Sequence, residues 1–160
     1  MDTVKQNLAL AHAEGVHGHH VSNYISSNLP LTFVRRYYDS EPEEALSPAE
    51  ALHFTYGELF QSLVDNEIDI SFSGATATTC FIEGSTVYTA NSGDSRAIIG
   101  SKVGKKSWVV KQLSNDHKPD SEHEAMRIIK AGGRVEPYWI PNEDGAGGEL
   151  LGPYRVWLLD

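Results

Sequence analysis

Small or apolar residues alternate with threonines over residues 75–82, and the same period of two returns over residues 86–91. Successive side chains of a β-strand point to opposite faces, so this period predicts two half-buried strands. Residues 83–85 between them contain a glycine, which takes a positive φ without steric cost and predicts a hairpin turn. A further turn over residues 92–94 and a strand over residues 95–99 extend the hairpin to a predicted three-stranded meander.

The N-terminal third of the chain predicts two helices. Residues 4–11 place apolar side chains three or four positions apart, which is a modest helical period. A clearer amphipathic pattern runs from Val21 to Leu29 and is expected to end at Pro30, which has no N–H for the preceding turn. Residues 31–47 contain an acidic patch and have the composition of a linker.

A stronger helix prediction begins at Ser47. Ser47 can cap the helix, Pro48 suits the first helical position and Glu50 closes a capping box. The helix is expected to run to about Asn66. Its apolar stripe, which should pack against the sheet, consists of Leu52, Tyr56, Leu59, Phe60 and Leu63.

The C-terminal third predicts strands around one helix. Residues 100–107 predict a lysine-rich turn that leads into a strand over residues 108–113. The helix is expected over residues 121–131, with a serine as its cap and two glycines as its end. Its buried face is expected to contain Met126 and Ile129, with Ile128 as a further candidate. The last elements are a strand, an acidic glycine-rich loop and a strand, at residues 134–136, 142–149 and 155–158.

Composition bounds the class of protein. The chain has 160 residues, one domain's worth, and its 40% hydrophobic and 22% charged residues are those of an ordinary globular protein. A net charge of −9 argues against nucleic acid or an anionic membrane as a partner, since both favour a basic surface. The sequence has neither an apolar run of membrane-spanning length nor the apolar core of a signal peptide. The single cysteine, Cys80, is expected to be a small buried residue and fits a reducing compartment, so we expect a cytoplasmic or nuclear protein.

Histidines and a glutamate gather near the start of the chain, at His12, Glu14, His17, His19 and His20. Imidazoles and a carboxylate suit zinc or nickel. A polar helix start is the preferred interpretation, because His19 and His20 are adjacent and therefore point apart, and no cysteine or aspartate completes a metal-binding set.

Asp94 lies where a strand ends and the backbone reverses, which is a usual place for a functional carboxylate. Most such aspartates only hold their turn by accepting backbone N–H groups, so both interpretations stay open. Asp116 and His117 offer a carboxylate and an imidazole side by side. Adjacent residues seldom converge on one atom, and a turn-forming role is therefore preferred for residues 116–119.

Four motifs in the right order resemble the middle of the metal-dependent protein phosphatases of the PPM (PP2C-type) family. They are SGATA at residues 73–77, ANSGDSRA at 90–97, DHKP at 116–119 and a segment of the form E-x-x-RI-x-x-AGG-x-V at 124–135. A lone GDSR carries little weight, whereas four ordered motifs identify the family. The resemblance covers residues 15–160 and leaves residues 1–14 as a non-matching N-terminal segment.

When the family's FDGHG motif is aligned on Gly15, this chain has other residues at several of the motif's positions. His12 falls at the aspartate that bridges the family's two catalytic metal ions, Ala13 at its glycine and Glu14 at its histidine. A neutral imidazole binds through one nitrogen and does not bridge two hard, oxygen-preferring cations. The family's C-terminal metal aspartates have no counterpart here either. The resemblance therefore assigns no catalytic residue and leaves Asp94, at the family's peripheral third metal, as the single metal candidate.

The resemblance implies an α+β fold, the PP2C-like α-β-β-α sandwich of two antiparallel sheets flanked by helices, incomplete at both ends. It also implies hydrolysis of phosphoserine or phosphothreonine in protein substrates with Mg²⁺ or Mn²⁺. The chain is then expected to be a truncated PPM-type serine/threonine phosphatase, inactive and only marginally stable alone. The alternative is a catalytically dead phosphatase-like module that binds a phosphoprotein or another partner.

Overall fold

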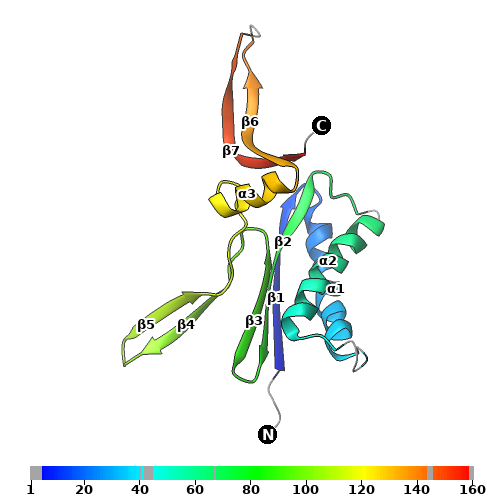
Figure 1. Cartoon of the computed structure of the whole chain (residues 1–160), viewed down its shortest axis with the longest axis vertical. Coiled ribbons are helices and arrows are strands. Elements are labelled where there is room, and N and C mark those ends of the chain that lie inside the picture. Colours follow the sequence, from blue (N-terminus) through cyan, green and yellow to red (C-terminus); the bar gives the residue numbers. More distant parts are fainter. Residues whose placement is uncertain (1–4, 40, 42–44, 67, 144–145, 159–160) are drawn as a thin grey trace. The chain divides into compact units, whose positions relative to one another are not determined.

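The computed structural model describes residues 5–39, 41, 45–66, 68–143 and 146–158. Its elements follow the order β1-α1-α2-β2-β3-β4-β5-α3-β6-β7 (Figure 1). The chain folds as two units, residues 1–116 and residues 117–160, and each is described by itself.

An antiparallel sheet of three strands, in the order β1-β2-β3, is the framework of the first unit. Its strands are β1 (Lys5–Gly15), β2 (Ser73–Glu83) and β3 (Thr86–Ser92). The central strand β2 pairs with β1 along its whole length, from Ser73 opposite Gly15 to Glu83 opposite Lys5. The predicted hairpin of β2 and β3 is confirmed, and Gly84 in its turn has φ 60°.

The helix predicted over residues 4–11 is wrong for the part of it that the structure describes, because this segment lies in β1. Residue 4 is outside the described residues. Leu8 and Leu10 alternate with Ala9 and Ala11, and Ala11 packs against the core beneath the helices. A short apolar run fits both a helix and a strand period, and the continuous partner strand β2 decides between them.

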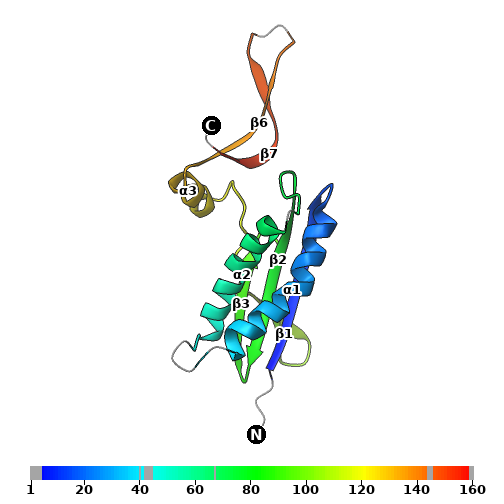
Figure 2. The ribbon, with the colours of Figure 1, turned by 90° about the vertical axis from the view of Figure 1, so that its right-hand side faces the viewer.

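Two helices, α1 (Gly18–Tyr38) and α2 (Pro48–Asp65), cover one face of this sheet (Figure 2). The helix end predicted at Pro30 is wrong, because Pro30 lies inside α1, and the linker predicted from residue 31 is helical as far as Tyr38. None of the described helices is long and apolar enough to cross a membrane.

The turns of α1 beyond Pro30 are held by contacts that compensate for its missing N–H. Phe33 is only 1% exposed, and its ring centroid lies 4.9 Å from that of Phe81 on β2. Arg36 donates to Glu58 of α2 through Nε at 2.8 Å and Nη2 at 2.6 Å. These long-range contacts are not visible in the local pattern, so the local rule at Pro30 failed.

The predicted beginning of α2 is confirmed. Ser47 Oγ accepts the N–H of Glu50 at 3.3 Å, and the Glu50 carboxylate accepts the N–H of Ser47 at 2.9 Å, which completes a capping box. The helix ends with Asn66 as its C-cap, as expected. The predicted apolar stripe needs one correction: Phe60 was expected to pack against the sheet, but it is 62% exposed. Phe60 lies about 100° around the helix from Leu59, outside the side that meets the sheet.

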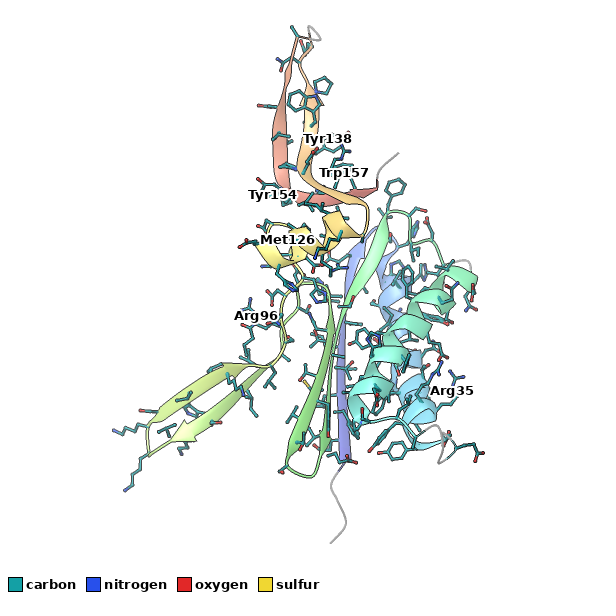
Figure 3. All side chains as sticks on the ribbon, in the orientation of Figure 1. Arg35, Arg96, Met126, Tyr138, Tyr154 and Trp157 are labelled. Carbon is teal, nitrogen blue, oxygen red and sulfur yellow. The ribbon has the colours of Figure 1, made fainter. Side chains whose placement is uncertain are left out.

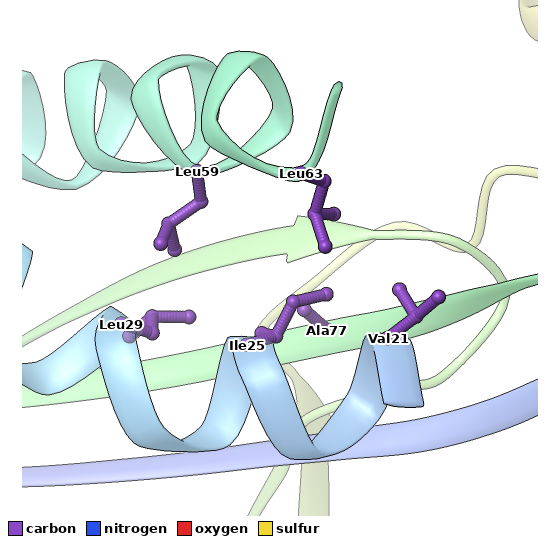
Figure 4. Close-up of a cluster of buried hydrophobic side chains, with 6 residues drawn as sticks. All are labelled: Val21, Ile25, Leu29, Leu59, Leu63 and Ala77. Carbon is purple, nitrogen blue, oxygen red and sulfur yellow. The ribbon is translucent and has the colours of Figure 1, made fainter. Parts of the chain in front are cut away.

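The core between the helices and the sheet consists of two clusters. One joins α1, α2 and β2 through Val21, Ile25, Leu29, Leu59, Leu63 and Ala77, whose side chains converge in Figure 4. The other joins the same three elements further along through Phe33, Ala51, Leu52 and Phe81. Fully burying one such large apolar side chain stabilises the fold by about 1.5–3 kcal/mol.

The prediction of a third meander strand in the same sheet is wrong. The chain leaves β3 at Gly93, and the strand that follows is β4 (Ile98–Val103), which pairs with β5 (Ser107–Gln112) in a separate two-stranded sheet. Residues 95–97 are instead held by side chains of the first sheet and of residue 114, as described below. All side chains of β4 and β5 are exposed.

The second unit contains α3 (Glu122–Lys130) and a hairpin of β6 (Gly133–Pro141) and β7 (Gly148–Leu158). The predicted helix and both strands are confirmed, with longer strands than expected. Pro137, which has no N–H to donate, lies at a register shift between Glu136 and Tyr138.

The predicted buried face of α3 needs a correction. Ile128 is buried, whereas Met126 and Ile129 are exposed. Glu124 is the other buried residue of this helix, because its carboxylate pairs with Arg127 one turn later. Ser121 stands at the predicted cap position, but its hydroxyl donates to the carbonyl of Lys118 and does not cap the helix.

Candidate functional site

Polar motif residues of the first unit lie on the face of the sheet that α1 and α2 do not cover. Ala77 belongs to the core beneath the helices, so its neighbours Thr76 and Thr78 on β2 point to the opposite face. Residues directly paired across antiparallel strands share a face. His12, opposite Thr76, and Asn91, opposite Thr78, therefore lie on this second face as well.

Asn91 joins three segments of the chain on this face. Thr78 Oγ1 donates to Asn91 Oδ1 at 2.5 Å, which links β2 to β3. Asn91 Nδ2 donates to the carbonyls of Gly93 and Asn115, each at 2.9 Å. One side chain thus closes the turn after β3 and fixes residue 115 beside it.

The turn after β3 passes directly over β2. Gly93 has φ +97°, and a Cβ at this position would lie 2.6 Å from Cγ2 of Thr76. Both the backbone conformation and the close approach therefore require glycine. Just beyond the turn, the hydroxyls of Ser95 and Thr76 are hydrogen-bonded at 2.7 Å, so the GDSR segment is fixed to the SGATA strand.

Arg96 and Asp116 connect the GDSR and DHKP motifs. The guanidinium donates from Nε to Asp116 Oδ1 and from Nη2 to Oδ2, both at 2.7 Å. Hydrogen bonds to Asp116 and its negative charge raise the pKa of Arg96 above its ordinary value. Beside the pair, Ser114 Oγ accepts the N–H of Ala97 at 2.8 Å. We call this network of Thr76, Thr78, Asn91, Ser95, Arg96, Ser114 and Asp116 the polar frame.

The sequence predicted only part of the polar frame. The Asp116 carboxylate is engaged by Arg96, and the turn-forming role preferred for residues 116–119 stays a prediction. Asn91 was missed as a functional residue, although an asparagine just before a glycine turn is a usual source of backbone hydrogen bonds. The pairing of Arg96 with Asp116 spans 20 positions and has no local pattern that indicates it.

Asp94 itself is exposed on the turn. Among the described residues, none donates a hydrogen bond to its carboxylate, and the turn is held by Asn91 instead. The interpretation in which Asp94 holds the turn through backbone N–H groups is therefore wrong. Its role as a metal ligand stays a prediction.

His12 and Glu14 form a pair at the end of β1. Nδ1 of His12 lies 3.1 Å from Oε1 of Glu14, and both side chains are more than half exposed. Positions 12 and 14 share the face that carries the polar frame. The position that the resemblance aligns with a metal-bridging aspartate thus carries an imidazole beside a carboxylate.

The donor set does not fit a pair of catalytic metal ions. Such a pair is held by several carboxylate oxygens, whereas His12 offers one nitrogen and Glu14 one carboxylate. Within the described ranges, no group of three or more His, Cys, Asp or Glu side chains is placed to hold a metal ion. The histidines that follow make ring contacts with one another, with centroids 4.0 Å apart for His19 and His20.

The fold and the polar frame define an α+β protein whose antiparallel sheet carries helices on one face and ordered motif residues on the other. The crystal structure of a serine-threonine phosphatase 2C from Toxoplasma gondii has this fold: its TM-score is 0.60 at 21% identity, over 88% of this chain and 51% of that chain. The family model for protein phosphatase 2C matches residues 3–144. The chain therefore belongs to the protein phosphatase 2C family, and the predicted PP2C-like fold is confirmed.

Curated relatives agree with this assignment. The chain is 35% identical over 148 residues to probable protein phosphatase 2C 64 of Oryza sativa subsp. japonica, covering 83% of this chain and 34% of the relative. It is 31% identical over 171 residues to probable protein phosphatase 2C 1 of Arabidopsis thaliana, covering 83% and 37%. The chain thus spans about a third of the length of these relatives. The family match begins at residue 3, and the boundary between residues 1–14 and 15–160 stays a prediction.

Proposed function

We propose that this chain is a PP2C-type serine/threonine phosphatase module that builds the polar frame of the family domain and hydrolyses no phosphoester by itself. The whole protein, in this proposal, removes phosphate from phosphoserine or phosphothreonine in protein substrates with Mg²⁺ or Mn²⁺. Support comes from the family membership and from the polar frame, which brings three of the four motifs together.

The observation that carries the proposal is the pair of His12 and Glu14. It stands at the end of β1, on the face of the polar frame, where metal-bridging oxygen donors would be needed. A bound metal pair supplies an activated water and neutralises charge on the phosphoryl oxygens. The residues present here order the surrounding segments, but the single carboxylate of Glu14 beside His12 does not provide the several oxygen ligands that a metal pair needs.

Asp94 is proposed as a weak ligand for a peripheral metal ion. Its carboxylate is exposed, and the turn beneath it is fixed by Gly93 and Asn91 without it. A single carboxylate holds Mg²⁺ or Mn²⁺ weakly, because these ions usually need further carboxylates or a phosphate. Broadening of the Gly93 and Ser95 amide signals by Mn²⁺ would report such a site. Equal broadening in the native chain and in Asp94→Asn would exclude Asp94 as the ligand.

The test of the main proposal is hydrolysis of a phosphothreonine peptide by the 160-residue chain with Mn²⁺ or Mg²⁺, with and without EDTA. We expect no release of phosphate above the rate in buffer. Turnover that depends on metal and disappears with EDTA would overturn the proposal.

A substitution at residue 12 tests separately whether the absence of an oxygen donor there matters for metal binding. His12→Asp places an oxygen donor at the end of β1, and we expect it to increase Mn²⁺ broadening of the amides around residue 12. Leu10→Asp is the matched control, because it adds a carboxylate to the same strand and face, two positions away from the motif. Equal broadening in both variants would mean that residue 12 does not bind Mn²⁺ better than another position on the same face of β1.

A further inference from the structure

A cavity of about 270 Å³ lies within the first unit, between α1, α2 and the sheet. Its floor consists of small residues of β2 and β3, namely Ser73, Gly74, Ala75, Ala77 and Ser92. Its walls are larger apolar side chains of the two helices, among them Ile25, Leu59 and Leu63. Phe60, which also lines the cavity, is largely exposed and marks its opening.

The lining excludes charged ligands. Of the described residues that line the cavity, none is Asp, Glu, Lys, Arg or His. Two of its hydroxyls are engaged elsewhere: the Tyr56 hydroxyl is 2.9 Å from Thr79 Oγ1 and donates to the carbonyl of Ala90, and Ser73 Oγ accepts the N–H of His17. A phosphate or carboxylate would therefore be desolvated there without a positively charged partner.

This mostly apolar cavity, open beside Phe60, leaves apolar side chains of both helices without close packing on one side. Interiors are packed almost without voids, and side chains around an empty space lose dispersion contacts. Ordered water needs several polar partners, and most of the side chains that line this cavity are apolar. An engineered apolar cavity of roughly 150 Å³ suffices to bind benzene, so this one has room for a larger molecule.

We propose that this cavity binds a compact, uncharged apolar molecule, such as an aromatic hydrocarbon or a short alkyl group. The small residues on the floor create the space, and Ile25 of α1 and the leucines of α1 and α2 supply the contacts. This site is separated from the polar frame by the sheet, because Ala77 and Thr76 point to opposite faces. The proposal does not depend on the proposed phosphatase function.

Toluene is the probe, added to the native 160-residue chain. We expect it to raise the melting temperature, as any ligand specific for the folded state does. We also expect it to shift the methyl NMR signals of Ala77, Leu59 and Leu63. Benzoate, which has a similar shape and a negative charge, should do neither. Binding of benzoate as tight as that of toluene would overturn the apolar character of the site.

Two variants separate filling of the cavity from a general effect on the sheet. Ala77→Val adds two methyl groups to the floor and should weaken toluene binding about tenfold or more. Ala90→Val makes the same change on the same face, at a position that does not line the cavity, and should leave toluene binding unchanged. Ala75→Val replaces Ala77→Val if that variant fails to fold. Equal binding in the floor variant and the control would refute the site.

Discussion

The two faces of the three-stranded sheet are stabilised by different kinds of contact. The face beneath α1 and α2 is covered by side chains of this chain and buries Ala77 and Phe81. The opposite face buries Thr76 and Thr78 among hydrogen-bonded polar groups but leaves Leu10 exposed. Figure 3 shows Arg96 on the segment that leads into β4, away from the helices. Apolar burial therefore stabilises the first face, whereas hydrogen bonds order the motif residues on the second.

The energies of the two faces should differ accordingly. A buried large apolar side chain contributes about 1.5–3 kcal/mol by its area alone. A typical hydrogen bond adds a net of about 0.5–1.5 kcal/mol, because the unfolded chain bonds to water instead. The helix-covered face should set the stability of the first unit, and the polar frame should set the geometry of its motifs.

The largest expected effect comes from Phe33→Ala. This change removes a buried ring that packs against Phe81 on the helix-covered face, and the free energy of unfolding should fall by about 3–5 kcal/mol. Leu10→Ala, on the exposed part of the opposite face, should change it by no more than about 0.5 kcal/mol. Urea denaturation measures both. Similar losses in the two variants would contradict the difference between the faces.

Tyr56 gives the next largest effect, at high pH. Burial raises its pKa from 10.0 to about 12, against the opposing effect of its hydrogen bond to Thr79. The unfolded chain loses the phenolic proton first, so this contribution is complete below pH 10 and is lost as pH rises from 10 to 12. The loss should reach about 2–3 kcal/mol.

The comparison of Tyr56→Phe with Tyr154→Phe isolates this effect. Tyr154 is exposed in the second unit, and its replacement should leave the fall in stability between pH 10 and 12 as it is in the native chain. Tyr56→Phe should remove most of that fall. An unchanged pH dependence in Tyr56→Phe would show that other groups cause it.

A smaller effect distinguishes Asn91 from Asp94 within the polar frame. Asn91→Ala removes three hydrogen bonds and should lower the free energy of unfolding by about 1–2 kcal/mol. Asp94→Ala removes an exposed carboxylate that the turn does not use, and its effect should stay within about 0.5 kcal/mol. Thermal denaturation of both variants checks the order. A larger loss for Asp94→Ala would restore its role in the turn.

The smallest effect on stability is expected at Leu8 and Leu10. Both are exposed on β1, on the face opposite the helices, and should bind a hydrophobic dye. Replacing both with serine should lower dye fluorescence while the midpoint of unfolding stays within about 0.5 kcal/mol of the native value. Unchanged fluorescence would place the dye elsewhere.

Local patterns were sufficient where neighbouring residues make the decisive contacts. The capping box of Ser47 and Glu50 lies within one helical turn and is formed as predicted. The hairpin at Gly84 needs only an alternating pattern and one residue with a positive φ. The four motifs also identified the family, since their order and spacing are properties of the sequence.

The predictions failed where distant residues make the decisive contacts. The helix across Pro30 persists because Phe33 meets Phe81, and residues 5–15 are a strand because β2 lies beside them. The buried face of α3 was misjudged because the pair of Glu124 and Arg127 places a charged residue inside. The first two errors replaced a long-range contact with a local preference, whereas the pair in α3 lies within one helical turn.

For the candidate site, too, some features followed from the sequence and others only from the tertiary structure. The sequence alone identified the motif segments, and it showed a histidine, His12, at the position that the resemblance aligns with the family's metal-bridging aspartate, because these are matters of residue type and order. Only the tertiary structure assigned the partners: Asn91 holds the turn, Asp94 is left exposed, and Arg96 closes on Asp116. The physical reason is that a hydrogen bond depends on distances of about 3 Å, and residues far apart in the sequence reach such distances only when the sheet has formed.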